Sequence, residues 1–119
     1  MTQRILIVDD EPDVRDYLSS YLEDHGYETL AAEDCRVAMD LIREDKPDLI
    51  LLDLMMPKEG GAGLCRKLCE TEGLKDIPIF VISGMVGKDI AAIQSLTIFE
   101  KPIDKEALLA SIEQVFRRT

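Results

Sequence analysis

Short runs of consecutive apolar residues alternate along the chain with longer segments in which apolar residues recur every three or four positions. Residues 5–8, 49–52 and 79–82 are apolar at every position, which is typical of strands covered on both faces of a sheet. Residues 27–31 predict a shorter, more exposed strand, and residues 97–100 predict a last one. The segments between these runs have the spacing of amphipathic helices.

Residues suited to helix ends mark the helix boundaries. Five helices are expected, and they begin near Pro12, Asp34, Leu64, Asp89 and Asp104. Gly26 and Pro47 stop the first two. The first helix should direct an apolar stripe at the core, formed by Val14, Tyr17, Leu18, Tyr21 and Leu22. This alternation predicts an α/β fold in one domain, residues 1–119, with a parallel sheet, helices on both faces and right-handed crossovers.

The net negative charge of the chain argues against some classes of binding partner. The 119 residues include 24 acidic and 14 basic side chains, a formal net charge of −10. This acidity argues against a nucleic-acid-binding surface and against docking onto anionic lipid. No apolar run approaches the ~18–20 residues of a membrane span, and no signal peptide fits the N-terminal residues. We therefore expect a cytoplasmic domain without nucleic-acid or membrane contacts.

The cysteines and the single histidine are interpreted as structural. Three cysteines in a domain large enough to fold without disulfides predict reduced thiols. Cys65 and Cys69 would share one helix face and could form a metal pair, but the chain offers one histidine and no second cysteine pair. Packing is therefore the preferred interpretation. His25 lies directly before Gly26 and is expected at a helix C-terminus, not in catalysis.

Four of the predicted strands are followed or closed by polar residues that could share one site. Asp9 and Asp10 follow the first strand, Asp53 ends the central one, and Ser83 and Lys101 follow the last two. Ligands of open α/β sheets bind outside the carboxyl ends of the strands, where the strand order reverses. We therefore expect three carboxylates, a hydroxyl and an ammonium group to converge there.

These groups suit phosphoryl transfer. Carboxylates ~4 Å apart repel by about 4 kcal/mol per pair at an effective dielectric near 20, so the cluster favours a bound cation. A site with oxygen ligands only is typical of Mg²⁺. A cation, a lysine and a hydroxyl can neutralise a transferring phosphoryl group, and a carboxylate can be the nucleophile. Asp53 is the best candidate because it ends the central strand.

The chain resembles the receiver domain of bacterial two-component response regulators, the flavodoxin-like family of the chemotaxis response regulator. The resemblance covers about residues 4–118 and rests on four motifs at residues 8–12 (Val-Asp-Asp-Glu-Pro), 53–57 (Asp-Leu-Met-Met-Pro), 82–84 (Ile-Ser-Gly) and 101–102 (Lys-Pro). It implies a doubly wound five-stranded parallel sheet, (βα)5, with strand order 2-1-3-4-5. It also implies a phosphorylation-dependent signalling switch.

The resemblance assigns a role to each candidate residue. Asp53 would accept a phosphoryl group from the phosphohistidine of a sensor histidine kinase or a histidine phosphotransfer protein. Mg²⁺ would be bound by Asp10, Asp53 and the backbone carbonyl of Met55, with Asp9 assisting through water. Ser83 would hydrogen-bond the phosphoryl oxygen, and Lys101 would pair with it. Such a domain catalyses only its own phosphorylation and a slow autodephosphorylation, and turns over no diffusible substrate.

Other interpretations stay open. The aspartates could cap a helix or form a turn, Ser83 could be an ordinary strand end, and Lys101 could be solvated. The domain could then be an interaction module with a vestigial site. Separately, it could be the receiver portion of a longer regulator with an output domain. A hydrolase is less well supported, because such phosphatases carry an aspartate where this chain has Met55. Flavin phosphate would need hydroxyls and amides where this chain offers carboxylates.

Two departures from the family concern the output mechanism. The family often has an aromatic switch residue three positions before the lysine, and this chain has Ile98 there. Phe99 follows it, so strand alternation predicts that Phe99 faces the opposite side of the sheet. Lys101 comes only 18 residues after Ser83, so the fourth helix should be short or displaced.

Overall fold

The computed structural model describes residues 2–53, 76–83, 97–100 and 103–117. Its elements, in chain order, are β1 (Arg4–Val8), α1 (Pro12–Asp24), β2 (Glu28–Ala32), α2 (Cys35–Glu44), β3 (Leu49–Asp53), β4 (Ile79–Ser83), β5 (Thr97–Glu100) and α5 (Lys105–Arg117). The helices expected to begin near Leu64 and Asp89 lie outside the described residues. The five predicted strands are all present.

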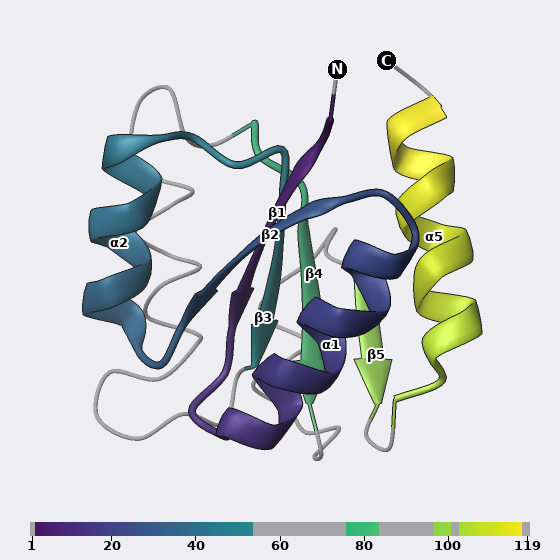
Figure 1. Ribbon diagram of the computed structural model, residues 1–119, viewed down its shortest axis with the longest axis horizontal. Coiled ribbons are helices and arrows are strands. Elements are labelled where there is room, and N and C mark those ends of the chain that lie inside the picture. Colours follow the sequence, from purple (N-terminus) through teal and green to yellow (C-terminus); the bar gives the residue numbers. More distant parts are fainter. Residues whose placement is uncertain (1, 54–75, 84–96, 101–102, 118–119) are drawn as a thin grey trace.

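The five strands form one parallel sheet with the order β2-β1-β3-β4-β5. This order confirms the flavodoxin-like arrangement expected from the sequence. The chain moves outward from β1 to β2 and then crosses back to β3 on the other side of β1 (Figure 1). The strand order therefore reverses between β1 and β3. A switch point of this kind leaves a crevice at the carboxyl ends of the two strands.

Helices cover both faces of the sheet (Figure 1). Successive strand side chains point to opposite faces, so each strand feeds two cores. One core joins the sheet to α1 and α5; its buried residues include Ile5, Ile7, Leu18, Leu22, Leu49, Leu51, Phe80, Leu108 and Ile112. The other joins the sheet to α2; its buried residues include Leu6, Val8, Ala38, Met39, Ile42, Ile50, Leu52 and Val81. Burial on both faces explains why the central strands have no polar position before their ends.

The predicted starts of α2 and α5 and the predicted end of α1 are confirmed. The Asp34 carboxylate accepts the Val37 backbone N–H at 2.9 Å and caps α2. Asp104 accepts from the N–H of Ala107 at 3.2 Å before α5. Gly26 follows α1 with φ +91°, a left-handed conformation that glycine adopts without a Cβ penalty.

The end of α1 also decides where β2 begins. The Tyr27 backbone N–H donates to the carbonyl of Leu22 at 3.1 Å, so Tyr27 still belongs to the helix end. The strand therefore runs from Glu28 to Ala32, one residue later than predicted. His25 lies at this helix end as expected, with Nδ1 2.9 Å from the carbonyl oxygen of Tyr21.

One member of the predicted apolar stripe of α1 is not in the core. Leu18 and Leu22 are fully buried, whereas Tyr17 is 46% exposed. Tyr17 lies at the edge between α1 and α5, where the Lys105 ammonium is 6.0 Å from its ring centroid and 5.4 Å from that of Tyr21. An aromatic ring with a hydroxyl can occupy such an edge because its polar tip stays in water and its face attracts a cation.

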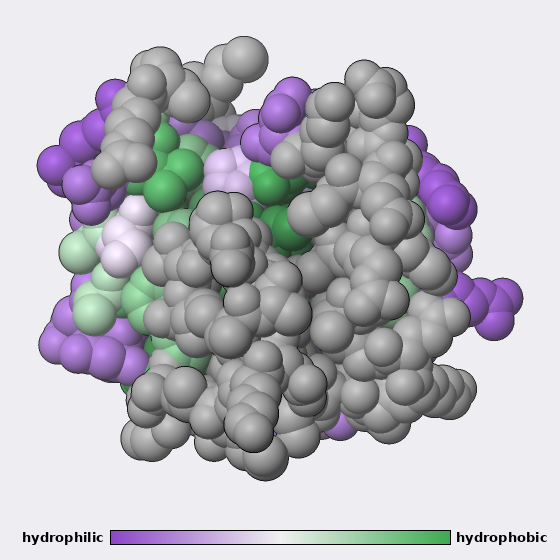
Figure 2. All heavy atoms as spheres, turned by 180° about the vertical axis from the view of Figure 1, so that it is seen from behind, coloured by the Kyte–Doolittle hydropathy of each residue, from purple (hydrophilic) through white to green (hydrophobic). Residues whose placement is uncertain are grey.

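Most exposed side chains of the described residues are polar. Seen from behind, described hydrophilic residues show at both sides of the molecule, and described hydrophobic residues show on the left and in the upper middle (Figure 2). Cys35 is buried at the start of α2, while Cys65 and Cys69 lie outside the described residues. Within the described part of the chain, no helix combines the length and the apolar composition needed to cross a membrane.

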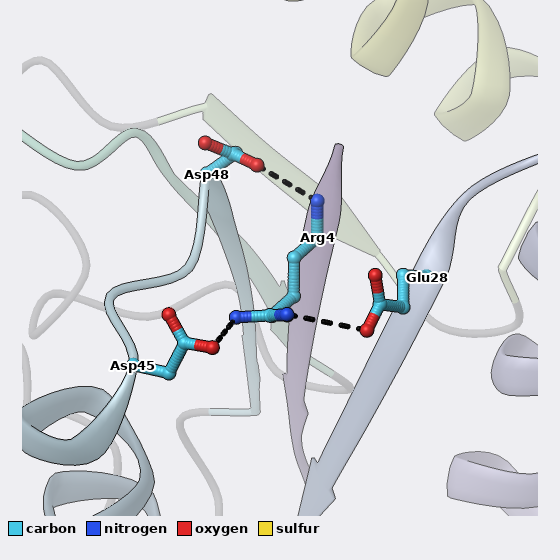
Figure 3. Close-up of polar contacts among 4 residues, drawn as sticks. All are labelled: Arg4, Glu28, Asp45 and Asp48. Carbon is cyan, nitrogen blue, oxygen red and sulfur yellow. Dashed lines mark hydrogen bonds and ion pairs between the residues drawn. The ribbon is translucent and has the colours of Figure 1, made fainter. Parts of the chain in front are cut away.

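Arg4 forms polar contacts at the amino ends of β1, β2 and β3, the edge of the sheet opposite the strands' carboxyl ends (Figure 3). Arg4 pairs with Glu28 of β2 at 3.2 Å and with Asp45 at the end of α2. Its backbone N–H donates to the Asp48 carboxylate at 2.8 Å, just before β3. One residue of β1 thus connects three segments that are distant in the sequence.

Candidate functional site

Three carboxylates meet at the carboxyl ends of β1 and β3. Asp9 and Asp10 follow β1, and Asp53 is the last residue of β3. The two strands are direct neighbours with Val8 opposite Leu52, so their ends lie side by side. One carboxylate oxygen from each aspartate lies within 4.8 Å of the other two. The structure therefore brings together the three acidic residues that the sequence predicted for this site.

Asp9 is held by its backbone and by its side chain. Its N–H donates to the Ala32 carbonyl at 3.1 Å, which extends the pairing of β1 with β2 by one residue. Its carboxylate accepts the Glu11 N–H at 2.9 Å. Pro12 at the first helical position has no N–H, and the Glu11 side chain does not cap α1. The hydrogen bond from the Glu11 N–H to Asp9 thus gives a partner to one of the backbone donors at the start of this helix.

Charge is concentrated at this site. Asp9 and Asp53 are each only 2% exposed, and Asp10 is exposed beside them. Two unit charges 4.8 Å apart repel by roughly 3.5 kcal/mol at an effective dielectric near 20. Buried carboxylates are costly unless opposite charge or hydrogen bonds compensate them. An oxygen-only set of this kind fits a hard divalent cation such as Mg²⁺.

The remaining predicted residues are placed only in part. Ser83 closes β4 one residue beyond Ile82, which is paired with Asp53, so its backbone lies at the same edge of the sheet. The Ser83 side chain, Met55 and Lys101 lie outside the described residues. The roles expected for these residues stay predictions.

Sequence reasoning missed Arg15, which also reaches this site. Its guanidinium Nη1 donates to the backbone carbonyl of Asp9 at 2.7 Å. Its backbone N–H donates to the Glu11 carbonyl at 3.2 Å, the helical bond that opens α1. The only sequence signal was a basic residue one helical turn after Glu11, too common a feature to single out.

Phe99 takes the face of the sheet covered by α1 and α5. Its ring lies 5.5 Å from that of Phe80, centroid to centroid, and it packs against the core between the sheet and these two helices. The side chain of Ile98 lies outside the described residues, so the predicted opposition of the two residues stays a prediction.

The chain is similar in sequence to known proteins over most of its length. Residues 5–113 match the family model of the response regulator receiver domain. Along all of its length the chain is 40% identical to the response regulator MprA of Mycolicibacterium vanbaalenii. It is 41% identical, over 97% of its length, to the phosphate regulon transcriptional regulatory protein PhoB of Pseudomonas aeruginosa. The match covers 52% of each relative, so the chain spans about half the length of these curated relatives.

Solved structures agree with this assignment. The chemotaxis protein CheY4 of Vibrio cholerae superposes with a TM-score of 0.88 and 26% identity, covering 97% of this chain and 99% of that one. The signal receiver domain of a signal transduction histidine kinase from Syntrophus aciditrophicus superposes with a TM-score of 0.90 and 27% identity, covering 99% and 92%. The chain therefore belongs to the receiver domains of response regulators, the signalling modules of two-component systems.

Proposed function

We propose that this domain is a phosphorylation-dependent switch in which Asp53 accepts a phosphoryl group from a phosphohistidine. The donor would be a sensor histidine kinase or a histidine phosphotransfer protein. The observation that carries the proposal is the cluster of Asp9, Asp10 and Asp53 at the switch point of a receiver-family sheet. Asp53 is the member of this cluster that lies on the central strand.

Mg²⁺ is the cation that the site would hold. Asp10, Asp53 and the backbone carbonyl of Met55 would bind it directly, and Asp9 would assist through water. The oxygen-only donor set and the proximity of the three carboxylates support this choice. When bound, the cation supplies positive charge that offsets the negative charge of the phosphoryl oxygens.

The transfer needs no general base, because an ionised carboxylate is already a nucleophile. An oxygen of Asp53 forms a bond to phosphorus while the bond from phosphorus to the donor imidazole nitrogen breaks. The nitrogen keeps the electron pair of the broken bond. In this proposal the Ser83 hydroxyl hydrogen-bonds a phosphoryl oxygen, and the Lys101 ammonium pairs with the added charge. Phosphorylation then changes the binding surface of the domain.

The output is proposed to lie outside residues 1–119. The relatives are about twice as long, and the name of the Pseudomonas aeruginosa relative describes a transcriptional regulatory protein. The net charge of −10 opposes direct nucleic-acid binding by this domain. We propose a cytoplasmic receiver domain that signals to a partner protein or to a fused output domain.

The test is phosphorylation by a small donor. The domain is incubated with Mg²⁺ and acetyl phosphate, and bound phosphate is measured by intact mass before and after treatment with hydroxylamine. We expect one hydroxylamine-labile phosphoryl group, absent from Asp53→Asn and present in Asp40→Asn, which alters an exposed aspartate of α2. Labelling of Asp53→Asn at the unsubstituted rate would overturn the assignment. Absence of labelling in every protein would favour a vestigial site.

A further inference from the structure

Arg15 forms a hydrogen bond with the acidic site, although it lies outside the four motifs that mark the receiver family in this sequence. It is partly buried in the first half of α1, and its Nη1 donates to the Asp9 carbonyl oxygen at 2.7 Å. A guanidinium donor gives a charge-assisted hydrogen bond, which is about twice as strong as a neutral one. The helix thereby bonds back to the turn that leads into it.

The bonded oxygen belongs to the peptide group between Asp9 and Asp10. This group is planar, so fixing its oxygen also fixes the direction in which the chain continues to Asp10. The two ends of the turn have partners as well, since the Asp9 N–H donates to Ala32 and the Glu11 N–H donates to the Asp9 carboxylate. Arg15 therefore holds the middle of a turn whose ends are already held.

We propose that Arg15 is a positioning residue for the cation site. By holding the peptide between Asp9 and Asp10, it keeps both carboxylates directed at Asp53 against their mutual repulsion. The inference rests on the proposed function, because it assumes that this cluster binds Mg²⁺. It assigns to Arg15 no contact with the cation or with the phosphoryl group.

Charge and position predict opposite effects of removing this guanidinium. As a charge, Arg15 repels an incoming cation, so its removal would tighten Mg²⁺ binding. As a positioning group, it keeps the carboxylates assembled, so its removal weakens binding. Partners that orient metal ligands are typically worth about 10- to 100-fold in metal affinity. The sign of the change therefore separates the two roles.

The experiment is a titration of the ¹⁵N-labelled domain with MgCl₂, following the amide signals of residues 9–11 and 53. The chain has no tryptophan, so fluorescence quenching offers no substitute. We expect Arg15→Gln to weaken Mg²⁺ binding about tenfold. The Lys side chain can still donate one hydrogen bond, so the Mg²⁺ affinity of Arg15→Lys should lie between those of Arg15→Gln and the unsubstituted domain. Arg43→Gln removes the same charge from an exposed position of α2 and should change the affinity less than about twofold.

Unchanged or tighter binding in Arg15→Gln would overturn the inference and leave the proposed function standing. If the unsubstituted domain failed to bind Mg²⁺, the proposed function would fall, and the inference with it. The thermal midpoint without Mg²⁺ reports separately on folding. If Arg15→Gln does not fold, Arg15→Lys decides: affinity equal to that of the unsubstituted domain would overturn the inference, and weaker binding would support it.

Discussion

Asp53 is an acidic residue at a buried position of the central strand, where the neighbouring positions are apolar. The four residues before it in β3 are leucine or isoleucine and are buried, and Asp53 itself is 2% exposed. A buried carboxylate beside two others costs stability unless opposite charge or hydrogen bonds compensate it, and such a cost is expected where function and stability conflict. The position therefore has a reason other than packing.

Neutralising Asp10 should separate stability from cation binding. Without Mg²⁺, Asp10→Asn should melt at a higher temperature than the unsubstituted domain, because one of three like charges is gone. A ligand that binds only the native state stabilises it by RT ln(1 + [L]/Kd). Mg²⁺ should therefore raise the melting temperature of the unsubstituted domain. It should barely change that of Asp10→Asn, because this variant lacks one of the proposed ligands. Asp40→Asn is the control. Equal Mg²⁺-dependent shifts in both variants would place the cation elsewhere.

Tyr27 is a residue whose pKa the fold alters. Burial raises the pKa of its phenol above the ordinary 10.0, the carboxylate of Glu113 adds to this, and Arg117 opposes it. The unfolded chain loses this proton first as the pH rises. Stability contributed by Tyr27 is therefore present below pH 10 and lost as the pH rises through the raised native pKa.

An ultraviolet titration of the folded domain tests this directly. The phenol of Tyr27 should ionise above its ordinary pKa of 10.0, as a late phase of the titration, and Tyr27→Phe should remove that late phase. Tyr17→Phe alters an exposed tyrosine and should keep it. A late phase that persisted in Tyr27→Phe and vanished in Tyr17→Phe would contradict the assignment.

At the scale of the element, single side chains set where helices start. Asp34 lies between β2 and α2 and accepts the Val37 N–H, which would otherwise lack a partner within the helix. α2 supplies Ala38, Met39 and Ile42 to the core on its face of the sheet. Anchoring its first turn therefore also fixes how these side chains meet the strands.

Removing this cap should destabilise the domain measurably. Asp34→Ala should lower the free energy of unfolding by about 1 kcal/mol, the usual cost of an N-cap replacement. Urea unfolding followed by circular dichroism provides the measurement. Glu33→Ala, at the exposed neighbouring position, should change it by less than about 0.5 kcal/mol. A loss in Glu33→Ala as large as that in Asp34→Ala would show that the cap is not responsible.

At the scale of the whole molecule, function and structural pairing lie at opposite edges of the sheet. The carboxylates gather at the carboxyl ends of the strands, and the Arg4 ion pairs join the amino ends (Figure 3). The five residues of β1 separate these edges by roughly 16 Å, at about 3.3 Å per residue. Charges that far apart are largely screened from each other in physiological salt.

Replacing Arg4 should therefore affect stability without affecting the site. Arg4→Gln should lower the urea midpoint at low salt, and less so at high salt, where such partly exposed pairs are screened. Its Mg²⁺ affinity should equal that of the unsubstituted domain. Weaker Mg²⁺ binding in this variant would show that the two edges are coupled through β1.

The sequence by itself determined the features that depend on neighbouring residues. Apolar runs located β1, β3 and β4, because a strand buried on both faces must be apolar throughout. Asp34 and Asp104 were recognised as caps and Gly26 as a helix end, because each acts on residues two to four positions away. The acidic cluster was also predictable, since parallel strands bring their carboxyl ends to one edge.

Tertiary structure alone decided which distant segments are in contact and which residues of a predicted apolar stripe are buried. Arg4 pairs with Glu28 and Asp45 because the strand order places those residues beside it, and no local pattern specifies such a partner. Tyr17 satisfies the helical periodicity of α1 but is 46% exposed, with the Lys105 ammonium of α5 over its ring. Arg15 bonds Asp9 because the turn before α1 brings that carbonyl back over the helix, a geometry that composition and spacing do not encode.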